Sequence, residues 1–144
     1  MGILKKGILF LCTGNSCRSQ MAEGFARNML LKDVKVFSAG INPEGIHPIA
    51  IKVMDEIGID ISEQKSKNLW EIPIDKISIV ITLCEDASER CPVFPGGAKR
   101  IHWILKDPAK AKGSEEEIIE EFRDTREKVK VYLKKEKWFN NLKK

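Results

Sequence analysis

The feature that most constrains the fold is a short apolar run that leads directly into a polar loop and then into a helical pattern. The run Ile8-Leu9-Phe10-Leu11 is typical of a parallel strand that is buried on both faces. A helix is expected from Ser19 to about Leu31. Its apolar face comprises Ala22, Phe25, Ala26 and Met29. A strand, a tight loop and a helix in direct succession predict an α/β domain.

The rest of the chain continues to alternate between strand and helix patterns. Further strands are expected at Val34 to Phe37, Ile77 to Leu83 and Arg100 to Leu105. One helix should begin at Pro48 and end at Gly58, and a last helix should follow the capping box Ser114–Glu117. This alternation predicts a parallel sheet whose ligands lie beyond the carboxyl ends of its strands.

Length and charge favour a small single-domain protein that binds anions. The 144 residues predict one domain spanning 1–144. We also expect the protein to be a monomer. A basic tail from about residue 134 surrounds Trp138 and Phe139, and we expect it to be a solvated helix end. Lys and Arg total 25 against 21 acidic residues, and the resulting charge of +4 suits small anions but is too weak for a nucleic-acid surface.

Nothing in the sequence predicts export or a membrane partner. No apolar run is long enough to cross a bilayer, and no signal segment opens the chain. We therefore expect a cytoplasmic protein. In that reducing compartment, its four cysteines should be catalytic or metal-binding rather than joined in structural disulfides.

The loop Cys12-Thr13-Gly14-Asn15-Ser16-Cys17-Arg18-Ser19 has the residues of an oxyanion site. Five residues separate Cys12 from Arg18, which lets successive amides and the helix N-terminus face one centre. The same field should lower the pKa of Cys12 well below the free value of about 8.5. Arg18 can present a planar fork to two anion oxygens, and Gly14 permits a positive φ. The alternative is an inert Cys12 and a solvated Arg18, but the position between strand and helix favours catalysis.

The segment Leu11 to Gly24 resembles the low-molecular-weight protein tyrosine phosphatase superfamily, and within it the thioredoxin-coupled arsenate reductases. The tyrosine phosphatases usually have proline where Gln20 stands, and isoleucine or valine where Ser16 stands. Further matches are Ser38-Ala39-Gly40, Val80-Ile81-Thr82-Leu83-Cys84, and His102-Trp103 leading to Asp107-Pro108. The resemblance covers nearly the whole chain apart from its C-terminal end. It implies a single α/β domain with a four-stranded parallel sheet flanked by helices.

Two later cysteines bear on the reaction. Cys84 ends the third predicted strand, at the same sheet edge as Cys12, and Cys91 follows after a polar segment. Alone, both would be interpreted as small buried hydrophobic residues. Beside the loop, the three thiols can form a relay, whereas Cys17 has no partner in this scheme and is expected to be structural. No second Cys or His pair completes a zinc set, so no metal or other bound cofactor is expected.

The resemblance implies a role for each of these residues. Cys12 attacks arsenic(V) while Arg18 and the loop amides hold the oxyanion. Asp107, on a loop stiffened by Pro108, protonates the departing oxygen, although alone it would be interpreted as a helix cap. Cys84 then attacks Cys12 and releases arsenite. Cys91 attacks Cys84, and the resulting disulfide is reduced by thioredoxin or a similar dithiol protein.

Further expectations concern the support of the loop and its motion. Ser19 should donate a hydrogen bond to Cys12, and Asn15 should hold an unusual backbone turn. The other residues expected to bind the oxyanion or support the loop are Thr13, Gly14, Ser16 and Cys17. Residues 85–90 should form a short polar helix that unwinds when Cys84 and Cys91 join, because residues seven apart in a helix lie about 10 Å apart along its axis. Hinges are expected at Pro92, Pro95, Gly96 and Gly97.

Two other functions compete with arsenate reduction. A phosphatase uses the same thiolate, arginine and aspartate, but it does not need Cys84 or Cys91, and phosphate and sulfate should in any case compete with arsenate. Phosphatases also usually carry aromatic residues after Asp-Pro, whereas Ala109-Lys110-Ala111-Lys112 follows here. Weak phosphatase activity is expected as a side reaction. The second competitor is a non-enzymatic redox sensor or a nucleic-acid-binding module that uses the basic tail.

One position departs from the family. Some thioredoxin-coupled reductases bind potassium through residues that match Asn15, Glu23, Ser38 and an aspartate. Lys67 stands where that aspartate is expected. An ammonium group would repel the ion, so the sequence predicts that Glu23 pairs with Lys67 instead.

Overall fold

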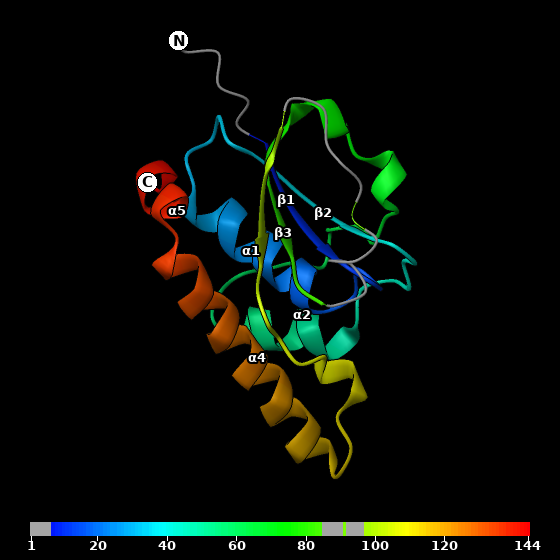
Figure 1. Ribbon diagram of the computed structural model, residues 1–144. Coiled ribbons are helices and arrows are strands. Elements are labelled where there is room, and N and C mark those ends of the chain that lie inside the picture. The colour runs from blue at the N-terminus through cyan, green and yellow to red at the C-terminus, as the bar shows by residue number, and fades with distance from the viewer. Residues whose placement is uncertain (1–6, 85–90, 92–96) are drawn as a thin grey trace.

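The computed structural model describes residues 7–84, 91 and 97–144. In this part of the chain, one parallel sheet has the strand order β2-β1-β3-β4 (Figure 1). Its strands are β1 (Gly7–Cys12), β2 (Lys35–Gly40), β3 (Ile77–Thr82) and β4 (Lys99–His102). The helices are α1 (Arg18–Met29), α2 (Pro48–Asp55), α4 (Glu115–Lys135) and α5 (Lys137–Leu142). The 3-10 turns are η1 (Leu69–Glu71), η2 (Ile74–Lys76) and η3 (Pro108–Lys110). The predicted four-stranded parallel sheet with flanking helices is confirmed.

The buried strand β1 divides the core into two clusters because its side chains alternate between the faces of the sheet. Ile8 and Phe10 belong to a helix-side cluster with residues of α1, α2 and α4, and Figure 1 shows α4 running along the outside of this layer. Leu9 and Leu11 belong to a far-side cluster that also contains Leu69, Ile72, Val80 and Cys91. Burial on both faces accounts for the continuous apolar run.

Several predicted boundaries differ from the structure. β2 continues to Gly40 instead of ending at Phe37. β4 ends at His102 instead of continuing to Leu105, because the chain leaves the sheet to form the segment that carries Asp107. Ile104 on that segment is 75% exposed. The second helix ends at Asp55, and the N–H of Gly58 donates to the Asp55 carbonyl in the turn that follows. The helix expected at residues 85–90 and the hinges at Pro92, Pro95 and Gly96 lie outside the described residues.

The C-terminal end is more integrated than a solvated tail. Its lysines are exposed as expected, but Phe139 is fully buried in the helix-side cluster. The Leu31 N–H donates to the Leu142 carbonyl at 2.9 Å, and the Lys144 N–H donates to the Met29 carbonyl at 2.9 Å. The apolar residues between the lysines therefore anchor α5 beside the end of α1. No described helix is long and apolar enough to span a membrane.

Candidate active site

The loop between β1 and α1 contains one unusual backbone turn, at Asn15, whose φ is 47°. The side chain of Asn15 fixes this turn on three sides. Its Nδ2 donates to Oγ of Ser19 at 2.8 Å and to Oγ of Ser38 at 3.0 Å, and its Oδ1 accepts the N–H of Lys67 at 2.9 Å. The conformation of the loop is therefore set by α1, β2 and the segment before η1.

The prediction of a positive φ at Gly14 is wrong, because the φ of Gly14 is not positive. A Cβ there would lie 2.5 Å from Oε1 of Glu44, the far end of a flexible side chain. The glycine that the loop requires is Gly40, at the end of β2. A Cβ at Gly40 would lie 2.6 Å from the Thr13 carbonyl oxygen and 2.9 Å from the Asn15 nitrogen. Gly40 thus allows β2 to approach the loop backbone.

Cys12 lies at the base of the loop and is 2% exposed. Its Sγ is 2.9 Å from Oγ of Ser19 and accepts the N–H of Asn15 at 3.2 Å. Burial raises the pKa of the Cys12 thiol, and the Ser19 hydroxyl, the Arg18 charge and the backbone amides lower it by less. The predicted low pKa is therefore wrong, because the loop that supplies the amides also removes the thiol from water.

This pKa direction predicts how Cys12 reacts with an alkylating agent. A raised pKa means that the thiolate forms only as the pH rises, so alkylation by iodoacetamide should still be accelerating at about pH 9. Mass spectrometry of the Cys12 peptide between pH 6 and 10 measures the profile. A plateau near neutral pH would contradict it. Ser19→Ala should shift the profile further toward high pH, because it removes a hydrogen bond to sulfur.

Arg18 is buried under the loop, with 7% exposure. Its Nη1 donates to the Leu83 carbonyl at 3.2 Å and to the Leu105 carbonyl at 3.0 Å. Its Nε is buried and has no hydrogen-bond partner among the residues that the structure describes. Since buried polar groups are nearly always paired, this N–H is a donor available to a bound oxyanion.

Asp107 faces Arg18 from the segment that follows β4. Its Oδ2 lies 3.6 Å from Nη2 of Arg18, while Oδ1 accepts the N–H of Ala109 at 3.0 Å and caps η3. Asp107 therefore caps η3 with one carboxylate oxygen and places the other beside Arg18 at the anion site.

A cavity of about 750 Å³ joins these groups. Cys12, Arg18, Cys84 and Asp107 all line it. The cavity rim also includes Glu44, His47, Lys106 and Lys110, which the sequence did not single out for this site. The position of His47 could have been predicted from the sequence, because it directly precedes Pro48, which begins a predicted helix. Its Nδ1 accepts the Ile49 N–H and caps α2.

All four cysteines are free thiols. Sγ of Cys84 lies 3.1 Å from Oγ1 of Thr13, so the second thiol contacts the loop that holds Cys12. Cys91 does not line the cavity; it is buried in the far-side cluster, against which Cys84 also packs. Cys17 is 3% exposed, and burial raises its pKa to about 12. Cys84 therefore borders both the oxyanion cavity and the cluster that contains Cys91.

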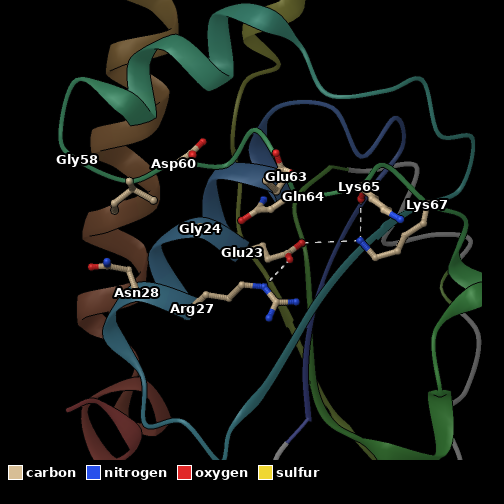
Figure 2. Close-up of a pocket in the computed structure, with 11 residues that line it drawn as sticks. Glu23, Gly24, Arg27, Asn28, Gly58, Asp60, Glu63, Gln64, Lys65 and Lys67 are labelled. Carbon is tan, nitrogen blue, oxygen red and sulfur yellow. Dashed lines mark hydrogen bonds and ion pairs between the residues drawn. The ribbon is translucent and has the colours of Figure 1, made fainter.

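Glu23 of α1 is a buried carboxylate, and Figure 2 shows Arg27 and Lys67 pointing toward it. It accepts hydrogen bonds from Ser38 Oγ at 2.5 Å and Arg27 Nε at 2.6 Å, and its Oε1 lies 3.9 Å from Nζ of Lys67. The predicted pairing of Glu23 with Lys67 is confirmed, and Arg27 is a second cation that the sequence analysis missed. Two cationic side chains at one carboxylate do not fit a potassium site. Across the described residues, no group of three or more His, Cys, Asp and Glu could hold a metal ion.

Turnover should accordingly be nearly independent of potassium. Replacing sodium chloride with potassium chloride at fixed ionic strength is expected to leave the rate unchanged, because Lys67 and Arg27 already neutralise Glu23. Steady-state kinetics in the two salts measures this. Activation of several-fold by potassium would contradict it.

Comparisons with known proteins place this geometry in a family. The model of the family "Low molecular weight phosphotyrosine protein phosphatase" matches residues 7–144, including the C-terminal end that the sequence resemblance left out. An arsenate reductase of Shouchella clausii is 47% identical over 131 residues, which cover 91% of this chain and 94% of the relative. A solved arsenate reductase in the phosphate binding state has a TM-score of 0.77 at 33% identity, over 95% of this chain and 98% of that chain.

A further solved structure is a thioredoxin-dependent arsenate reductase of Corynebacterium glutamicum. It has a TM-score of 0.64 at 28% identity, and the match covers 93% of this chain and 63% of that chain. The chain therefore belongs to the low molecular weight phosphotyrosine protein phosphatase family, among its arsenate reductases.

Proposed function

We propose that the protein reduces arsenate to arsenite through Cys12, Cys84 and Cys91, and that a thioredoxin-like dithiol protein regenerates it. The observation that carries the proposal is the 3.1 Å contact between Cys84 and Thr13, which puts a second thiol beside an oxyanion cavity. Hydrolysis of a phosphoester needs only one thiol, whereas reduction of arsenate needs two.

The first step forms a bond between Cys12 and arsenic. Arg18 donates to the oxyanion through its Nε–H, which has no partner within the described part of the chain, and the loop amides face the remaining oxygens. Burial raises the pKa of the Cys12 thiol, and its proton passes to a basic oxygen of the arsenate dianion as sulfur attacks. Asp107 delivers the proton with which one arsenate oxygen leaves as water.

The next two steps move the oxidation along the thiols. Cys84 attacks the sulfur of Cys12, the sulfur–arsenic bond breaks, and its electron pair stays on arsenic, which leaves as arsenite. Cys91 then attacks Cys84, and Cys12 departs as a thiolate. Two electrons have passed from Cys84 and Cys91 to arsenic, and the Cys84–Cys91 disulfide remains.

Support for the external donor comes from the Corynebacterium glutamicum relative, which is thioredoxin-dependent. Two thiols of such a donor would reduce the Cys84–Cys91 disulfide by exchange. The net charge of +4 supports binding of small anions rather than nucleic acid. The proposed protein is a cytoplasmic monomer without a membrane partner. Retention on DNA and gel filtration test these two points.

Phosphatase activity is proposed only as a side reaction. The family match supports it, and Cys12, Arg18 and Asp107 suffice for it. However, the residues after Pro108 on the cavity rim are Ala109 and Lys110, which offer no aromatic surface to a substrate ring.

An assay of arsenate-dependent NADPH oxidation with thioredoxin and its reductase tests the proposal. The wild type should turn over many times, whereas Cys84→Ser should not reduce arsenate and should keep its hydrolysis of p-nitrophenyl phosphate. Loss of both activities to the same extent in Cys84→Ser would favour the phosphatase. A redox sensor would form disulfides without arsenate-dependent turnover.

A further inference from the structure

Cys91 is buried among apolar side chains, which disfavours the thiolate that it needs to act as a nucleophile. The thiol is 8% exposed and belongs to the far-side cluster. The residues of that cluster from β1, β2, β3 and η1 are apolar: Leu9, Leu11, Ala39, Leu69, Ile77 and Val80. Burial raises the pKa of the Cys91 thiol. A group that favours the thiolate is therefore needed for attack on Cys84.

Arg100 approaches Cys91 from the edge strand. It is the second residue of β4 and pairs with Val80 of β3. The next residue, Ile101, packs against the helix-side cluster, so Arg100 lies on the opposite face of the sheet, where Cys91 is buried. Nη2 of Arg100 donates to the Cys91 carbonyl oxygen at 3.4 Å. The charge of Arg100 and a side-chain hydrogen bond from it lower the pKa of the Cys91 thiol, against the larger effect of burial.

We propose that Arg100 is the positioning residue for the last internal step of the relay. It holds the backbone of Cys91 and stabilises its sulfur as a thiolate for attack on Cys84. The inference rests on the proposed function, because it assigns a residue to one step of that reaction. Arg100 is the charged group that acts on the Cys91 thiol, and Cys84 packs against the same cluster.

The step is a thiol–disulfide exchange, in which one disulfide forms as another breaks and the enzyme is neither oxidised nor reduced overall. Cys91 loses its proton to solvent, a bond forms between the sulfurs of Cys91 and Cys84, and the Cys12–Cys84 bond breaks. Cys12 leaves with the electron pair and takes up a proton. Arg100 contacts neither Cys12 nor arsenate in this scheme, so arsenite release, which precedes the exchange, should not depend on it.

The test is a single turnover of reduced enzyme with one equivalent of arsenate and no thioredoxin, quenched with N-ethylmaleimide. Peptide mapping then separates the Cys12–Cys84 and Cys84–Cys91 disulfides. In Arg100→Gln, arsenite release should match the wild type, while conversion to Cys84–Cys91 should slow by about threefold at pH 7. Loss of the guanidinium leaves less Cys91 thiolate at this pH, and the greater nucleophilicity of a less acidic thiol offsets part of that loss, so the expected slowing is modest.

The pH profile separates activation from structure. The difference between Arg100→Gln and wild type should disappear as the pH rises above the pKa of Cys91, and Arg100→Lys should restore most of the rate at pH 7. Lys99→Gln is the matched control, because it removes the same charge from the neighbouring, exposed residue of β4. It should leave both steps unchanged.

Three results would overturn the role of Arg100: unchanged exchange in Arg100→Gln, equal slowing at every pH, or the same slowing in Lys99→Gln. Absence of arsenite release from the wild type would instead overturn the proposed function. If the wild type releases no arsenite, the effect of Arg100 on Cys91 can still be measured without arsenate. The pH profile of Cys91 alkylation in the reduced enzyme should shift upward in Arg100→Gln and stay in place in Lys99→Gln.

Discussion

Cys91→Ser is expected to release about one arsenite per enzyme and then stop, because Cys12 and Cys84 alone can complete the two-electron reduction. The 3.1 Å contact of Cys84 with Thr13 keeps the second thiol beside the cavity whether or not Cys91 is present. The remaining Cys12–Cys84 disulfide blocks the nucleophile, so thioredoxin should not sustain turnover. Cys12→Ser should release no arsenite and should lose any phosphatase activity.

Chromatographic separation of arsenite from arsenate measures the stoichiometry. Cys84→Ser provides the matched comparison: it retains Cys12 and Cys91, but it lacks the thiol beside the cavity, and it should release no arsenite. Several arsenite molecules per Cys91→Ser enzyme would contradict the relay. A full equivalent from Cys84→Ser would mean that Cys91 can reach Cys12 directly.

Local patterns were sufficient to predict the sheet and the residues of the loop. The run from Ile8 to Leu11 is short and apolar at every position, as is typical of a strand covered on both faces, and it forms most of β1. The spacing of Cys12 and Arg18 then placed a thiol and a guanidinium around the same turn. These features depend on neighbours within a few residues, which a sequence displays directly.

Features that depend on the packing of distant segments could not be predicted. The pKa of Cys12 was misjudged because its burial depends on the whole fold, whereas its stabilising amides are local. Asn15 holds an unusual turn as the sequence predicts, but the positive φ expected at Gly14 lies at Asn15 itself, which Ser38 and Lys67 hold in place. Phe139 was included in a basic tail because burial by α1 and α4 is invisible in the charge pattern.

Arg18→Lys is expected to lower kcat/KM for arsenate by at least about a hundredfold, the usual effect of removing one preorganised oxyanion donor. In the native protein a single guanidinium holds the Leu83 and Leu105 carbonyls through Nη1, faces Asp107 through Nη2, and keeps Nε free of protein partners among the described residues. A lysine ammonium is a point charge without this planar division of donors. An ammonium group that donates to the two carbonyls would have at most one N–H left to donate to the oxyanion.

Binding and stability measurements distinguish this explanation from simple unfolding. Phosphate affinity measured by calorimetry should fall together with kcat/KM, whereas the far-UV circular dichroism spectrum should stay unchanged. The melting temperature should fall modestly, because the Leu83 and Leu105 carbonyls lose a buried donor. If Arg18→Lys kept its phosphate affinity and its kcat/KM within threefold, Arg18 would be only a structural link between the segments after β3 and β4. The oxyanion would then have to be held by the loop amides alone.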